Sequence, residues 1–234
     1  MQTTEDQKVK STPVPSATSS ADSERLERWI ALVKANQRNV LIGVGALAVV
    51  AGGVWFTMSA RERRESFARR ELDQARVSAE AGNLPLAAND LSRIIATYSA
   101  TGAGQEAVLL LAQVRLLQDQ APLAVAELQR FVSEGPAAQY RSPAHRALGA
   151  ALEQTGQYAE AGRAYEDAAR TSEYDLLAAQ ALIEAGRAYT LAGDTPSAIR
   201  VYEQLLQDYA DAPANTEARL RMAELGKYDS PTTR

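Results

Sequence analysis

The fold is decided by residues 148–169, which read LGAALEQTGQYAEAGRAYEDAA. In this segment, two stretches with apolar residues at helical spacing flank a central glycine, Gly156. Glycine readily adopts the left-handed backbone conformation that ends a helix, so the pattern predicts two helices joined by a tight turn. We therefore expect a helical hairpin here.

The hairpin pattern recurs along the chain at intervals of 37 residues. Prolines mark one column of the repeat and small residues mark another: Pro85, Pro122 and Pro196; Ala75, Ala112, Gly149 and Gly186. Proline suits the first turn of a helix, where its missing N–H has no intrahelical acceptor to lose. The columns predict a solenoid of four stacked hairpins and a last helix, from about Pro213 to Leu225, that caps the stack.

Two further details of the hairpins follow from single residues. Glycine inside a helix costs up to about 1 kcal/mol relative to alanine, so Gly149 and Gly186 predict a close helix crossing as the compensation. Thr195 is the best candidate for an N-cap among the second helices that begin near a proline. Asp119 stands where the other units have a turn glycine.

Several residues of the third unit resemble the signature of the tetratricopeptide repeat (TPR) family: Leu148, Gly149, Gly156, Tyr158, Ala161, Tyr165 and Ala168. The resemblance implies an all-α solenoid in which the first helices of the hairpins line a concave, protein-binding surface. The phase of the repeats places these residues on that surface: Arg69, Leu72, Arg76, Glu106, Leu109, Gln113, Arg146, Glu153, Gln180, Ile183 and Arg187. Arg76 and Arg187 occupy equivalent places, and guanidinium groups bind carboxylates bidentately, so a partner carboxylate is one hypothesis. An ordinary solvated surface is the alternative.

Residues 39–60 contain no charged side chain and predict a transmembrane helix, with Val40 to Met58 in contact with lipid. Ala48 and Gly52 form a small-xxx-small pair, which makes a homo-oligomer a further expectation. The remaining segments are expected as follows: a disordered tail over 1–22, an amphipathic helix at the membrane surface over 23–38, a helical stem over 61–70, the repeat domain over 71–226 and a flexible tail over 227–234.

The order of these segments resembles the ancillary SecYEG translocon subunit (YfgM-like) family of bacterial inner-membrane proteins. That resemblance implies a periplasmic repeat domain beside the translocon, in contact with translocon, chaperone or client polypeptides. Arginines are more frequent after the predicted span than before it, which favours a repeat domain facing the cytoplasm as the alternative. Two other functions remain open: a factor for cell division, the cell envelope or outer-membrane assembly, and a structural accessory subunit of a larger membrane complex.

The composition offers little for catalysis, because the chain has no cysteine and a single histidine, His145. We expect His145 at the start of a helix, with no second histidine to complete a metal site. Acidic residues interrupt the arginines and the net charge is −4, which disfavours a nucleic-acid partner. The sequence therefore predicts a membrane-anchored scaffold for protein interactions, with no enzymatic activity and no cofactor.

Overall fold

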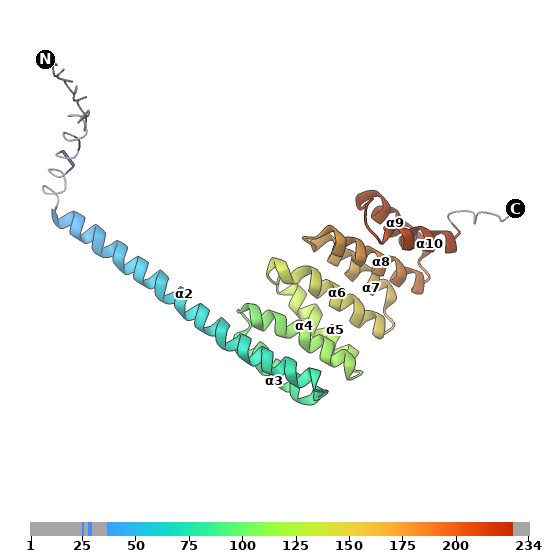
Figure 1. Ribbon diagram of the computed structural model, residues 1–234, viewed down its shortest axis with the longest axis horizontal. Coiled ribbons are helices and arrows are strands. Elements are labelled where there is room, and N and C mark those ends of the chain that lie inside the picture. The colour runs from blue at the N-terminus through green and yellow to red at the C-terminus, as the bar shows by residue number, and fades with distance from the viewer. Residues whose placement is uncertain (1–24, 26–27, 30–36, 227–234) are drawn as a thin grey trace, which may run out of the picture. The chain divides into compact units, whose positions relative to one another are not determined.

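The computed structural model describes residues 25, 28, 29 and 37–226. The segments predicted as tails, 1–22 and 227–234, and most of the predicted helix 23–38 lie outside these residues. Within the described part of the chain every element is an α-helix, as the sequence predicted (Figure 1). The elements are α2 (Gln37–Glu80), α3 (Leu84–Tyr98), α4 (Gly102–Leu117), α5 (Ala121–Ser133), α6 (Ala138–Gln154), α7 (Tyr158–Thr171), α8 (Asp175–Leu191), α9 (Thr195–Asp208) and α10 (Asn215–Glu224).

The chain divides into two units between Ser59 and Ala60. In the second unit, consecutive helices pack as antiparallel hairpins that stack side by side, and α10 packs on α9 at the end (Figure 1). We call α2, α4, α6 and α8 the first helices of the hairpins, and α3, α5, α7 and α9 the second helices. The predicted helical-hairpin solenoid and its final helix are confirmed.

The turns inside the hairpins have the predicted left-handed residue. The φ angles are 79° at Gly82, 77° at Gly156 and 75° at Gly193. In the second hairpin Asp119 takes the same place with a φ of 58°, a conformation that is costly for a residue with a Cβ atom. Prolines stand in the first turns of α3, α5 and α9, as their spacing predicted.

The interpretation of Thr195 as an N-cap is wrong, because Thr195 is already the first residue of α9. The cap is Asp194, whose carboxylate accepts a hydrogen bond from the Ser197 N–H at 3.1 Å. The side chain of Asn83 caps α3 in the same way, at 3.4 Å from the N–H of Leu86. In both hairpins, the capping residue directly follows the turn glycine.

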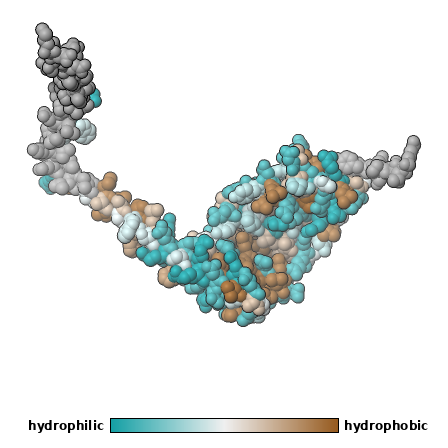
Figure 2. Space-filling model, in the orientation of Figure 1, coloured by the Kyte–Doolittle hydropathy of each residue, from teal (hydrophilic) through white to brown (hydrophobic). Residues whose placement is uncertain are grey.

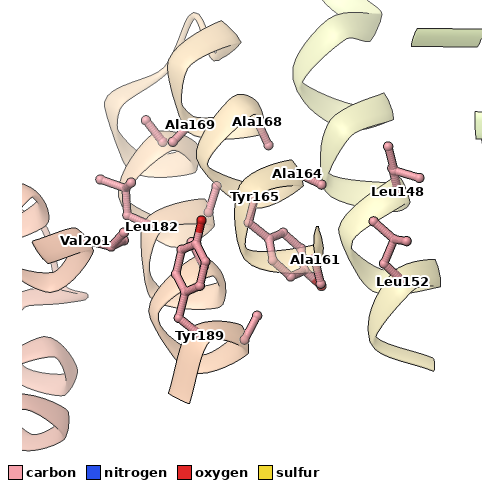
Figure 3. Close-up of a cluster of buried hydrophobic side chains, with 14 of the residues drawn as sticks. Leu148, Leu152, Ala161, Ala164, Tyr165, Ala168, Ala169, Leu182, Tyr189 and Val201 are labelled. Atoms are coloured by element: carbon pink, nitrogen blue, oxygen red, sulfur yellow. The ribbon is translucent and has the colours of Figure 1, made fainter. Parts of the chain in front are cut away.

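The mid-helix glycines mark close contacts, as predicted, and the contacting groups are tyrosine rings. A Cβ atom on Gly149 would lie 2.6 Å from the ring of Tyr165, and one on Gly186 would overlap the ring of Tyr202. Each pair joins the two helices of one hairpin. Tyr165 and Tyr202 are almost fully buried, and Figure 3 shows the Tyr165 ring within the core that α6 and α7 share.

The same columns hold a different pair in the first two hairpins. There, Ala75 and Ala112 stand in place of the glycines, and Leu91 and Leu128 stand in place of the tyrosines; all four are buried. The larger ring thus comes with the smaller facing residue, which keeps the combined volume of each pair nearly constant. Constant volume is what a core packed to crystal-like density requires.

Glu65 connects α2 to the start of α4. Its carboxylate accepts hydrogen bonds from the backbone N–H groups of Gly102, at 2.7 Å, and Ala103, at 3.2 Å. The Thr101 side chain accepts from Gly104 N at 3.0 Å, so three N–H groups that have no partner within α4 are satisfied. A carboxylate also interacts favourably with the positive end of a helix.

Helix α2 includes the stretch predicted to cross a membrane. Among the residues that the structure describes, no helix meets the length and hydropathy needed to span a bilayer. The side chains of Val40, Leu41, Gly43 and Val44 are outside that described set. The large apolar side chains that are described between positions 42 and 58 are exposed, among them Val49 and Trp55, and Figure 2 shows apolar surface on this stretch.

We predict that Gly186→Ala lowers the free energy of unfolding by about 1–3 kcal/mol, because the added methyl group overlaps Tyr202. Tyr202→Leu alone leaves a cavity beside Gly186. The double variant restores the alanine–leucine pair of the first two hairpins, so it should lose at least about 1 kcal/mol less than the sum of the two single losses. Urea unfolding followed by circular dichroism measures all three. Strictly additive losses would contradict the volume argument.

A second prediction concerns the turn of the second hairpin. Asp119→Gly should raise the free energy of unfolding by about 0.5–1 kcal/mol, because glycine adopts a positive φ without steric cost. The matched control is Gly156→Asp, which places aspartate in the equivalent turn and should have the opposite sign. The measurement is again urea unfolding. A loss of stability in Asp119→Gly would show that the aspartate carboxylate has a stabilising role.

Candidate functional site

Ion pairs connect neighbouring first helices on the face where sequence analysis placed the binding residues. Arg146 on α6 donates two hydrogen bonds to the Glu184 carboxylate on α8, at 2.8 and 2.5 Å. Arg187 on α8 donates to both oxygens of Glu153 on α6, at 3.3 and 3.2 Å. We call these two pairs the α6–α8 ladder.

The junction of α2 and α4 has one pair of the same kind. Arg76 contacts Glu106 at 2.5 Å, whereas Arg69 pairs at 3.0 Å with Glu65 on its own helix. The sequence suggested that Arg76 and Arg187 bind a partner carboxylate. Each of them instead forms an ion pair with a glutamate of this chain. The sequence did not predict these glutamate partners.

A hollow of about 390 Å³ lies between α4 and α6, where the ion pairs are replaced by apolar residues. Its lining includes Leu109, Leu116, Ala147 and Ala150, all partly exposed. Gln113, Arg146 and Glu184 contribute polar groups to the lining, and Tyr165 reaches it from α7. We call this site the α4–α6 hollow.

The electrostatics of the α4–α6 hollow are close to neutral. The hydrogen bond to Glu184 raises the pKa of Arg146, and the guanidinium charge is offset by the carboxylate that it contacts. Burial, together with the nearby Glu153 and Glu184 carboxylates, raises the pKa of Tyr165. The phenol is therefore uncharged at neutral pH, and the hollow has an apolar wall without net charge.

The structure brings together some of the residues predicted for binding and separates others. Leu109, Gln113 and Arg146 meet in the hollow. Leu72 does not belong to the surface: it is 1% exposed and packs in the core of the first hairpin, because the apolar side of α2 faces α3 and α4. Gln180 is exposed and Ile183 partly exposed on α8, outside the lining of the hollow.

Leu116, Ala147, Ala150 and Glu184 line the hollow without having been selected from the sequence. Leu116 and Ala147 were not selected, because apolar residues at helical spacing give no sign of partial exposure. Ala150 occupies the place equivalent to Arg76 and Arg187 but has no charge to single it out. A signal did exist in the repeat itself. The counterparts of Leu116, Ala147 and Ala150 one unit later are all charged: Glu153, Glu184 and Arg187.

His145 lies within α6 and not at the start of a helix as expected, because α6 begins at Ala138. Its Nδ1 atom is 3.8 Å from a carboxylate oxygen of Asp167. Burial lowers the pKa of His145, and the Asp167 charge only partly opposes that effect. Among the described residues, no three His, Asp or Glu side chains are grouped so that they could hold a metal ion.

A larger hollow, of about 580 Å³, lies on the side of the second helices. It runs between α3 and α5, with Ile95 and Phe131 among its apolar residues and Arg130 and Glu134 among its charged ones. None of the residues predicted for binding lines it. We therefore take the α4–α6 hollow as the candidate site.

Comparisons with known proteins agree with this architecture. Residues 180–212, which span most of α8 and α9, match the family model described as tetratricopeptide repeat. No curated protein matches the sequence.

Many solved structures share the fold, and three of them illustrate the similarity. The structure described as "Podosopora anserina putative kinesin light chain nearly identical TPR-like repeats" has a TM-score of 0.55 and 20% identity, over 70% of this chain and 87% of that one. Pseudomonas aeruginosa pilF has a TM-score of 0.52 and 17% identity, over 69% and 68% of the two chains. A Parabacteroides merdae tetratricopeptide repeat protein has a TM-score of 0.53 and 16% identity, over 68% and 59%. The described repeats therefore form a TPR-like solenoid.

We predict that Arg146→Met lowers the free energy of unfolding by about 1–2 kcal/mol, because Glu184, whose side chain is only 16% exposed, loses its charged partner. The matched control is Arg163→Met. Arg163 pairs with Glu160 at 3.5 Å with both side chains exposed, and its loss should change stability by no more than about 0.5 kcal/mol. Equal losses in the two variants would show that the ladder is not stabilising.

Proposed function

We propose that this chain is a membrane-anchored scaffold that binds other polypeptides through the face formed by α4, α6 and α8. The observation that carries the proposal is the α4–α6 hollow, a partly apolar site on the face that the first helices form. Stacked helical repeats present extended surfaces for protein partners, and the TPR-like fold belongs to that class. We propose no catalytic role, because binding and not chemistry suits an apolar hollow bordered by a neutralised ion pair.

The anchor that we propose is the segment from Val40 to Met58. Its sequence contains no charge, and the side chains described within it are exposed, for example Leu47 at 74% and Val50 at 65%. Contiguous exposed apolar residues of this kind mark surfaces that are covered by lipid or by another protein. Lipid is the occupant that the uninterrupted apolar character favours.

We further propose that the anchor lies in a bacterial inner membrane with the repeats in the periplasm, where the partners are translocon subunits, chaperones or exported client polypeptides. The sequence resemblance to the ancillary translocon family supports this placement. The arginines after the anchor are interleaved with glutamates, which reduces the local excess of positive charge. A folded domain also crosses the membrane largely regardless of flanking charge.

Two measurements on the full chain in bacteria test this proposal. A reporter enzyme that folds only outside the cytoplasm, fused after Arg234, should be active, and the chain should remain in the membrane pellet after alkaline carbonate extraction. A photo-crosslinking amino acid at Gln113 should capture translocon subunits, chaperones or exported proteins.

The matched control carries the same crosslinker at Ala96, an exposed position on α3, and should capture much less of these proteins. A silent reporter with normal expression would overturn the periplasmic placement. Extraction by carbonate would overturn the anchor. Equal capture from both positions would overturn the role of the α4–α6 face.

A further inference from the structure

The α4–α6 hollow occupies the place where the α6–α8 ladder would be repeated one unit earlier. The ladder consists of four charged residues, Arg146, Glu153, Glu184 and Arg187. Their counterparts 37 residues earlier are Leu109, Leu116, Ala147 and Ala150. All four counterparts line the hollow. Two leucines and two alanines at the α4–α6 junction thus stand in place of the two ion pairs of the following junction.

The replacement explains why a hollow exists at this junction. In the α6–α8 ladder, long charged side chains reach from one first helix to the next and cover the surface between them. Alanine does not reach across, so Ala147 and Ala150 leave the space in front of Leu109 and Leu116 open. The result is an apolar opening between two stretches of the face that carry ion pairs.

We propose that the α4–α6 hollow binds an uncharged apolar side chain, such as leucine, from an extended segment of a partner polypeptide. This inference rests on the proposed function and specifies the partner's chemistry. Its volume of about 390 Å³ falls within the range of roughly 300–1,000 Å³ that is typical of ligand sites. The hollow is confined to one junction, so it accommodates one or two side chains and not the face of a long helix.

Charge selects against other occupants. The guanidinium of Arg146 is engaged by Glu184, and that of Arg187 by Glu153, so a partner carboxylate meets no unpaired cation here. A partner lysine would likewise compete with arginines for carboxylates that are already paired. Burying a charge without a compensating partner is unfavourable, whereas an apolar side chain loses nothing on leaving water.

Gln113 provides the polar contact that an extended segment needs. It is exposed on α4 beside the leucines, and its amide makes no hydrogen bond within the described part of the chain. An amide group both donates and accepts, so it can pair with a backbone N–H and a backbone C=O of the bound segment. The first and fourth units have arginine at this place, Arg76 and Arg187.

The test uses the full chain in lipid nanodiscs and a nine-residue probe of glycine, serine and asparagine with photo-leucine at its centre. Irradiation should give crosslinks that map by mass spectrometry to α4 and α6. Excess of the same peptide with central leucine should reduce the crosslinks at least tenfold. Excess of peptides with central serine, aspartate or lysine should leave them within twofold.

The decisive variant transplants the ladder: Leu109→Arg, Leu116→Glu, Ala147→Glu and Ala150→Arg together. It adds no net charge, and it should reduce crosslinking at least tenfold. The matched control is Ser92→Glu with Ala96→Arg on α3, which adds one charge of each sign away from the hollow and should change crosslinking less than twofold. If the fourfold variant has a lowered melting temperature, the single variant Ala150→Arg tests the same point. It should reduce crosslinking at least fivefold.

Three results would overturn the inference: displacement of the probe by the aspartate or lysine peptide as well as by the leucine peptide, undiminished crosslinking of both ladder variants, or crosslinks that map outside α4 and α6. These results leave the proposed function intact, because capture from Gln113 in cells is an independent measurement. Conversely, probe binding in nanodiscs without capture in cells would contradict the proposed partners. It would still support the binding of an apolar side chain in the α4–α6 hollow.

Discussion

The contact between a small residue on one helix and a large side chain on its partner is the constraint on which the hairpins depend. In the third and fourth hairpins a glycine contacts a tyrosine ring. In the first two hairpins the same two columns hold an alanine and a leucine. Neither column varies alone. Each hairpin thus has one complementary small–large pair in its core, which is compatible with hairpins that stack as similar units.

Much of this fold could be predicted from the sequence because the repeat shows each feature several times. Three turn glycines and three prolines located the hairpins, and the structure confirms them. The cap of α9 could not be read from residue type alone. Asp194 and Thr195 are both good caps, and only the position of the helix start decides between them. The burial of the Leu72 side chain was not predicted, because helical spacing does not distinguish the edge of an apolar stripe from its centre.

The candidate site was harder to predict, since it depends on pairs of residues from different helices. The ladder pairs are separated by 38 and 34 residues, so neither follows the 37-residue period. The two residues of an ion pair therefore never fall in the same column of the repeat. The repeat pattern therefore placed Arg146, Glu153 and Arg187 on one face but did not predict which of their charges pair. The hollow itself is a difference between two junctions, and only a structure shows that the four substituted positions meet in space.

The hydrogen bonds of Glu65 to the start of α4 have a consequence for how α2 can turn. One residue of helix corresponds to a rotation of about 100° about the helix axis. A shift of α2 by a single residue relative to α4 would carry the carboxylate away from both the Gly102 and Ala103 N–H groups. Glu65 thus fixes the rotation of α2 about its own axis relative to α4. A change of register would break these hydrogen bonds as well as the apolar contacts of the core.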